Sequence, residues 1–119
     1  MTLEECYNKL HGDYQEAQGR LMSDKLINRF ILRFPSDPSM DALREMIAAK
    51  ENASAFRAVH TLKGVAANLA FTELFKNASN LTEQMRDLVS EADPVLYANV
   101  EESYKLVIDT LKEYEESQK

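Results

Sequence analysis

The chain has 119 residues, of which 45% are hydrophobic and 29% charged, and its formal net charge is −6. This composition predicts one globular domain over residues 1–119, and the acidic balance argues against nucleic acid as a partner, because nucleic acids select basic surfaces. No apolar run approaches the roughly 18 residues that a membrane span needs, and no segment resembles a signal peptide. The single cysteine, Cys6, excludes an internal disulfide, so we expect a cytoplasmic protein that does not enter a membrane.

The pattern of apolar residues is helical throughout, and no segment alternates with period two. The N-terminal helices are predicted within residues 1–22. Thr2 and Glu5 form a capping box that starts the first helix, and Gly12 ends or bends it. A short second helix follows, with Tyr14, Ala17 and Leu21 on its apolar face.

Residues 23–115 carry the strongest apolar stripes. Ser23 starts the first of them, and Pro35 and Pro38 close it. The stripes cover four segments, about residues 24–34, 52–70, 72–90 and 94–114, with a shorter helix over about 39–49. Asn52 is predicted to cap the second of the four segments. Asp93 and Pro94 place an N-cap residue before a proline at the first position of the last helix.

Long amphipathic helices joined by short loops pack as antiparallel bundles. We therefore expect an all-α fold, an antiparallel four-helix bundle with up-down-up-down connections. The short N-terminal helices would lie across one end or side, and residues 116–119 would form a frayed tail.

His60 lies on the helix face that the apolar residues avoid. At about 100° per residue, Ala58, Leu62, Val65 and Leu69 fall on the opposite side from His60. Phe56, Lys63, Gly64 and Ala67 fall near His60, with Arg57 somewhat further round. The pattern thus predicts an exposed imidazole beside a cation, on a strip cleared of bulk by Gly64 and Ala67.

Few residues could support independent catalysis. The chain has two histidines, no glycine-rich phosphate loop and no H-E-x-x-H motif, and the predicted core stripes hold almost no metal-ligating side chains. We therefore expect no ATP site, no metal and no enzyme activity. What remains is a histidine acting as a nucleophile, because an unperturbed imidazole titrates near ~6.5 and is mostly neutral at pH 7.

Phosphoryl transfer depends mainly on positioning and charge compensation, which a metal-bearing partner can largely supply. His60 would supply the ring nitrogen, Lys63 a cation for the phosphoryl oxygens, and Gly64 with Ala67 the room for the partner. Phe56 either docks the partner or packs against a neighbouring helix; both interpretations stay open. For Gly64, close packing within the protein is the alternative to partner access.

The segment Ala58-Val59-His60-Thr61-Leu62-Lys63-Gly64-Val65-Ala66-Ala67-Asn68-Leu69 resembles the signature of the histidine-containing phosphotransfer (HPt) domain. The resemblance implies that His60 is the phosphoacceptor, that Lys63 stabilises the phosphoryl charge and that Gly64 admits a receiver domain. Phe56, Arg57, Ala67 and Asn68 would then contact that partner.

The chain departs from the family's pattern at two places. Ala70 stands where the family often has glycine, which could alter the end of the helix. On the facing helix, where the family often has an amide or carboxylate near the histidine, this chain has Thr82, followed by Glu83 and Gln84. Thr82 and Glu83 are both candidates for orienting the imidazole.

The resemblance implies a phosphorelay intermediate that takes a phosphoryl group from a receiver aspartyl-phosphate and passes it to another receiver. The Mg²⁺ would belong to the receivers, one of which a hybrid histidine kinase could carry, and the chain would act as a monomer without a cofactor. Two other interpretations remain: a helical adaptor that binds partners through the His60 face without being phosphorylated, and an enzyme with His60 as general base.

Overall fold

The computed structural model describes residues 1–119 and consists of seven α-helices, one 3-10 turn and no strand. The helices are α1 (Leu3–Lys9), α2 (Tyr14–Leu21), α3 (Asp24–Arg33), α4 (Ser39–Ala48), α5 (Asn52–Asn68), α6 (Thr72–Gln84) and α7 (Pro94–Ser117), and the turn η1 (Phe34–Ser36) separates α3 from α4.

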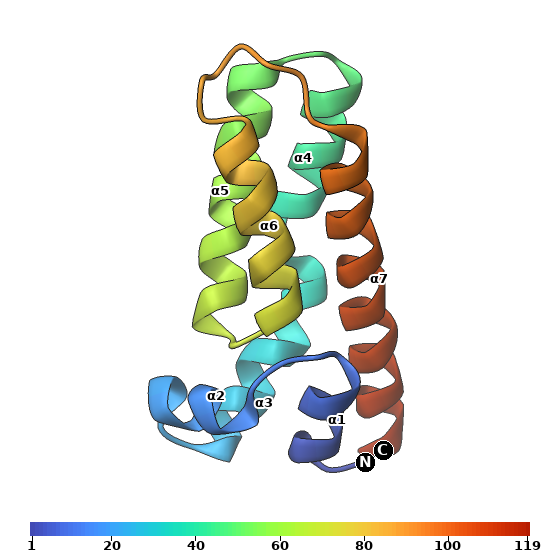
Figure 1. Ribbon diagram of the computed structural model, residues 1–119. Helices are drawn as coiled ribbons and strands as arrows, with labels where there is room; N and C mark the ends of the chain where they lie inside the picture. Colours follow the sequence, from blue (N-terminus) through green and yellow to red (C-terminus); the bar gives the residue numbers. More distant parts are fainter.

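Helices α4, α5, α6 and α7 run up, down, up and down side by side (Figure 1). Helix α5 packs between α4 and α6, and α6 packs in turn on α7. This arrangement confirms the all-α, antiparallel four-helix bundle. One detail differs: residues 24–34 carry one of the four strongest stripes and were expected to form a bundle helix, but α4 is the helix that packs on α5. The cause is the η1 turn with Pro35 and Pro38, because proline interrupts a helix and α3 is thereby set below α4.

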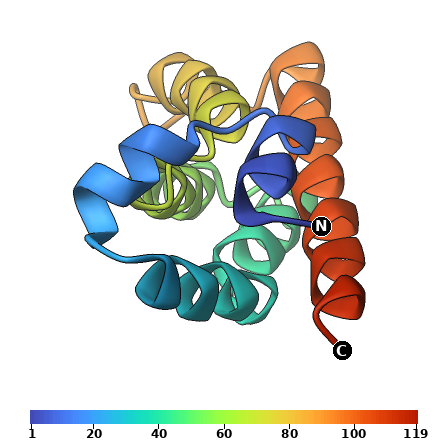
Figure 2. The same cartoon turned by 90° about the horizontal axis from the view of Figure 1, so that it is seen from below.

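Helices α1, α2 and α3 lie across the lower end of the bundle (Figure 2). Three hydrogen bonds attach the first two to the α5–α6 turn. The buried hydroxyl of Tyr7 donates to the carbonyl of Leu69 at 2.7 Å, the backbone N–H of Asp13 donates to the carbonyl of Ala70 at 2.9 Å, and that of Glu73 donates to the carbonyl of His11 at 3.1 Å. The N-terminal helices therefore support the turn that follows the His60 helix.

Most of the predicted helix ends are confirmed. Thr2 forms its capping box with Glu5, and Ser23 and Asp93 cap α3 and α7 through their side chains. The prediction for Asn52 is wrong. Glu51 occupies the N-cap position of α5 without a side-chain cap, and the Asn52 amide instead donates to the carbonyl of Val89 at 2.9 Å.

The C-terminal tail is more ordered than the expected fraying of residues 116–119. Helix α7 continues through Ser117, whose hydroxyl donates to the carbonyl of Tyr114 at 2.6 Å. The side chain of Gln118 donates to the carbonyl of Met1 at 2.9 Å, so the two chain ends meet.

Ala70 does not disturb the end of the His60 helix. It adopts a left-handed conformation with φ of 57°, and the N–H of Phe71 donates to the carbonyl of Ala66 at 2.9 Å while that of Ala70 donates to Ala67 at 3.1 Å. These two bonds form a Schellman motif. The helix therefore ends as it would with glycine, although alanine carries the cost of a Cβ in that conformation.

One hydrophobic core of 25 buried residues runs through the bundle and its lower end. Cys6 is completely buried in it, and burial raises the pKa of its thiol to about 11. No helix combines the length and the apolar character that crossing a membrane requires.

Candidate functional site

His60 occupies an exposed position in the middle of α5. The buried residues of this helix form the stripe on its other side: Ala55, Ala58, Val59, Leu62 and Ala66. This is the arrangement that the helical period predicted, except that Val65 is only half-buried. The imidazole forms no hydrogen bond within the protein. The polar side chains next to it have other partners, since Arg57 donates to Ser54 and Thr61 donates to the backbone carbonyl of Arg57.

A cluster of aromatic and charged side chains borders His60 on the side of α6. The ring centroid of Phe56 lies 5.9 Å from that of His60, within the usual range for aromatic contact. The Cζ atom of Arg86 lies 5.7 Å from the centroid of the same Phe56 ring, and Glu83 accepts hydrogen bonds from Arg86 at 2.6 and 3.1 Å. Phe56 is half-buried against the core, so it both packs within the bundle and borders the imidazole.

Charge pairing shifts the pKa values of Glu83 and Arg86. The hydrogen bonds from Arg86 hold the pKa of Glu83 below its usual value, and the positive charge of Lys63 adds a smaller effect in the same direction. Reciprocally, Glu83 raises the pKa of Arg86. Lys63, which is half-buried, therefore lies near enough to act on Glu83.

Gly64 and Ala67 leave the strip below His60 clear. Gly64 is exposed, and a Cβ added to it would meet no atom within 4 Å. Close packing within the protein therefore does not explain this glycine. Arg57 and Asn68 are also exposed on this side of α5, so the candidate partner-contact residues share one accessible face with His60.

Thr82 does not orient the imidazole in this structure. Its side chain is completely buried, and its hydroxyl donates to the carbonyl of Ala78 one turn earlier at 2.7 Å. The prediction failed because Thr82 lies on the buried face of α6. Glu83 is exposed, but it is bonded to Arg86 rather than to His60.

Arg86 is the residue of this cluster that the sequence did not reveal. It follows the end of α6 at Gln84, where the helical period no longer fixes the direction of a side chain. Its place over Phe56 depends on how α5 and α6 are aligned, and no local motif encodes that alignment.

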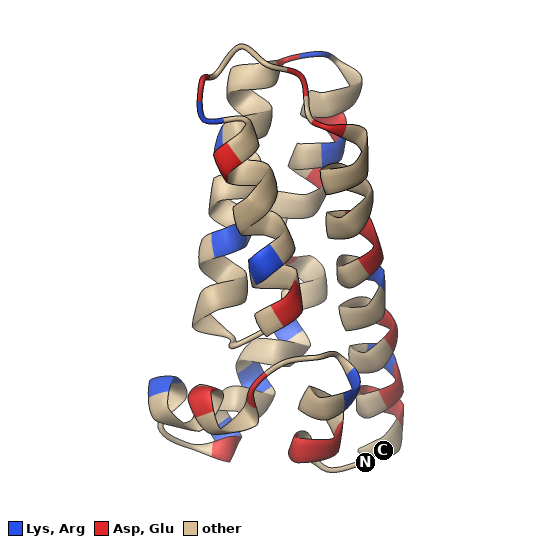
Figure 3. Ribbon diagram, viewed as in Figure 1, with Lys and Arg blue, Asp and Glu red and all other residues tan.

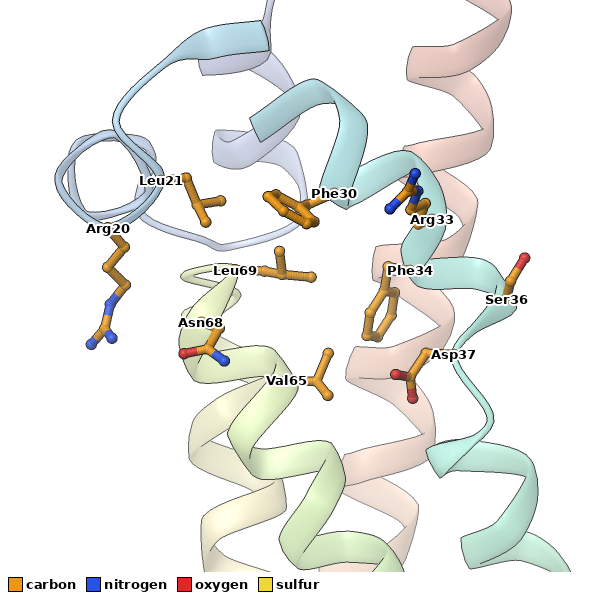
Figure 4. Close-up of a pocket in the computed structure, with 10 residues that line it drawn as sticks. All are labelled: Arg20, Leu21, Phe30, Arg33, Phe34, Ser36, Asp37, Val65, Asn68 and Leu69. Atoms are coloured by element: carbon orange, nitrogen blue, oxygen red, sulfur yellow. The ribbon is translucent and has the colours of Figure 1, made fainter. Parts of the chain in front are cut away.

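An apolar groove of about 680 Å³ opens between α2, α3 and the C-terminal end of α5. Leu21 from α2, Phe30 from α3, and Leu69 after α5 point toward one another in it, with Arg20 and Arg33 toward its edges (Figure 4). Phe30 is 38% exposed, which is high for a phenylalanine in a small domain. Asn68 lines the groove as well, about two helical turns beyond His60, whereas Val65 and Leu69, the other groove residues at this end of α5, lie on the opposite side of the helix from His60.

The charges are unevenly distributed. Acidic side chains gather along α7, whereas α5 carries only the basic residues Arg57 and Lys63 (Figure 3). No three His, Cys, Asp or Glu side chains gather in a way that could hold a metal ion. The His60 face is thus a cationic, partly apolar surface on an acidic protein.

The structure is a small four-helix bundle that presents one unpartnered, exposed imidazole, His60, beside cations and an open glycine. A family model described as the Hpt domain matches residues 26–114, which is most of the chain, so the chain belongs to the Hpt domain family. Hpt domains are phosphocarrier modules whose histidine takes part in phosphotransfer with receiver domains in two-component signalling. No curated protein and no solved structure matches the chain.

Proposed function

We propose that this protein is a phosphorelay intermediate that accepts a phosphoryl group on His60 from the aspartyl-phosphate of one receiver domain and donates it to another. The single observation that carries the proposal is the exposed imidazole of His60 in the middle of α5, without a hydrogen-bond partner in the chain. We further propose that the protein acts in the cytoplasm as a monomer.

The positions of the residues around His60 suggest the role of each in the transfer. Lys63, one turn beyond His60, would offset the charge of the phosphoryl oxygens, and the receiver would supply the Mg²⁺. Gly64 lies under open space, which supports close approach of the receiver. Phe56, Arg57, Ala67 and Asn68 would contact the receiver around the histidine, and a receiver that extends past Asn68 would reach the groove at Leu21 and Phe30.

The test is phosphotransfer from a radiolabelled receiver domain in the presence of Mg²⁺. Wild-type protein should acquire an acid-labile, base-stable phosphate, and His60→Gln should acquire none while keeping its helical circular dichroism. Undiminished labelling of His60→Gln would refute the assignment. Binding of receivers without any labelling of the wild type would favour the adaptor instead.

Lys63 is tested in the same assay. Lys63→Ala should slow labelling roughly tenfold, which corresponds to about 1.4 kcal/mol of transition-state stabilisation, and the thermal midpoint should stay near that of the wild type. Labelling at the wild-type rate would remove Lys63 from the mechanism.

A further inference from the structure

Glu83 and Arg86 form an ion pair next to Phe56, the ring that borders His60. The two carboxylate oxygens of Glu83 accept from the Nη2 and Nε atoms of Arg86 at 2.6 and 3.1 Å. This bidentate geometry is the one in which a guanidinium pairs most strongly with a carboxylate or a phosphate. In the unphosphorylated protein, Glu83 therefore holds the face of Arg86 that a phosphoryl group would use.

The pair is positioned relative to His60 by Phe56. Arg86 lies over one side of the Phe56 ring at 5.7 Å, and the imidazole borders the same ring at 5.9 Å. Lys63 acts on Glu83 as well, as its contribution to the lowered pKa of that carboxyl shows. Glu83 thus offsets the charge of Arg86, which lies over the ring beside His60, and acts on Lys63 as well. Arg57, the other cation of α5, is bonded to Ser54 instead.

We propose that Glu83 competes with the phosphoryl group of phosphorylated His60 for Arg86 and Lys63, and so shifts the phosphotransfer equilibrium toward the receiver. This inference rests on the proposed function. It replaces the expectation that Glu83 orients the imidazole, because the carboxylate is bonded to Arg86 and not to the ring.

The charge on His60 changes during the transfer, and this change explains how Glu83 would act. A lone pair on one ring nitrogen of His60 forms the N–P bond while the P–O bond to the receiver aspartate breaks, and that electron pair stays on the aspartate carboxylate. The proton on the other ring nitrogen remains in place. A phosphoryl group of about −1.5 to −2 charge then lies near the carboxylate of Glu83, and like charges repel. Donation to the next receiver removes the phosphoryl charge, and Arg86 then pairs with Glu83 again.

The experiment is the equilibrium distribution of radiolabel between a receiver domain and this protein. Glu83→Gln keeps the shape of the side chain but removes its charge, and it should shift the distribution toward phospho-His60 by about three- to fivefold, as expected for an exposed ion pair. Arg86→Ala should shift it the other way. In the Arg86→Ala background, Glu83→Gln should have a smaller effect, because one of the two contested cations is gone.

A matched control removes an equal charge elsewhere. Asp109→Asn breaks the pair of Lys105 and Asp109 on α7, a helix that packs on α6 rather than beside α5. It should leave the distribution unchanged, and a shift equal to that of Glu83→Gln would overturn the proposal by assigning the effect to net charge.

A second readout uses His60 phosphorylated chemically with phosphoramidate. In a ³¹P NMR titration, Glu83→Gln should lower the pKa of the phosphoryl group, because Arg86 and Lys63 are then free to stabilise its charged form. An unchanged or higher pKa would overturn the proposal. An orienting role for Glu83 instead predicts slower labelling with the same equilibrium.

The failures of the two proposals are distinguishable. If the wild type is labelled and Glu83→Gln shows the wild-type equilibrium, the competition is refuted and the relay stands. If no phosphorylated receiver labels the wild type, both proposals fall.

Discussion

Replacing Gly64 by alanine or leucine adds a side chain where α5 presents its open face. Nothing lies within 4 Å of the added Cβ, so alanine displaces no atom of the protein. Gly64 is exposed, so a leucine side chain has solvent to extend into. Glycine in a helix interior costs about 1 kcal/mol relative to alanine, and leucine is nearly as favourable as alanine. Both variants should therefore raise the free energy of unfolding by about 0.5–1 kcal/mol, which for a domain of this size is roughly 3–5 °C in the thermal midpoint.

The same substitutions should impair phosphotransfer. In the proposed relay, the receiver would cover Gly64, so a methyl group should reduce the labelling rate modestly and a leucine side chain should reduce it at least tenfold, about 1.4 kcal/mol or more. Stability is measured by urea and thermal unfolding, and transfer by labelling from a phosphorylated receiver.

Gly19 offers a matched control. It is also a helical glycine, in α2, with no atom within 4 Å of an added Cβ. Gly19→Ala should gain similar stability and keep the wild-type labelling rate. A destabilised Gly64→Ala would contradict the open space above α5, and full labelling of Gly64→Leu would show that receivers do not approach over this position.

Three further predictions concern residues away from the exposed face. Ala70→Val should cost at least about 2 kcal/mol of unfolding free energy in urea, because a β-branched residue is strained in the left-handed conformation; equal stability would contradict the observed φ of 57°. Buried Cys6, with its pKa raised to about 11, should resist Ellman's reagent at pH 8. In the unfolded state the thiol loses its proton from about pH 8.5, whereas the folded state keeps it. The free energy of unfolding should therefore fall between about pH 9 and 11, by on the order of 2 kcal/mol. A free energy of unfolding in urea that does not change over this pH range would contradict the prediction. Thr82→Val should leave labelling kinetics unchanged, since its hydroxyl serves the carbonyl of Ala78, and a large loss of rate would restore an orienting role.

The sequence predicted the bundle and the exposure of His60 because both depend on the helical period within one segment. A residue's angle around a helix follows from its number alone, so His60, Lys63 and Gly64 could be placed together without knowing what packs nearby. The caps at Ser23 and Asp93 were predictable for the same reason, since a cap involves only the next few residues.

What could not be predicted depends on how separate segments are aligned. Phe56 and Arg86 are 30 positions apart, and their contact requires the ends of α5 and α6 to meet at one level. Asn52 has the side chain of a capping residue, but it bonds to Val89 in the loop after α6. Leu21 was predicted on an apolar helix face, and Phe30 lies within the predicted stripe of residues 24–34, but only the folded chain brings the two into one groove.

Residues 1–25 lie ahead of the family match, yet they are integral to the site's surroundings. Tyr7 holds the turn that ends the His60 helix, and Arg20 and Leu21 form one wall of the groove beside it. In the proposed relay, a receiver that reached the groove would meet this wall, so substitutions in it would alter which receiver surfaces fit while leaving the histidine and its neighbours intact. The choice of partner and the chemistry of the phosphate would then diverge independently, and a fragment starting at residue 26 would keep the histidine but lose that wall.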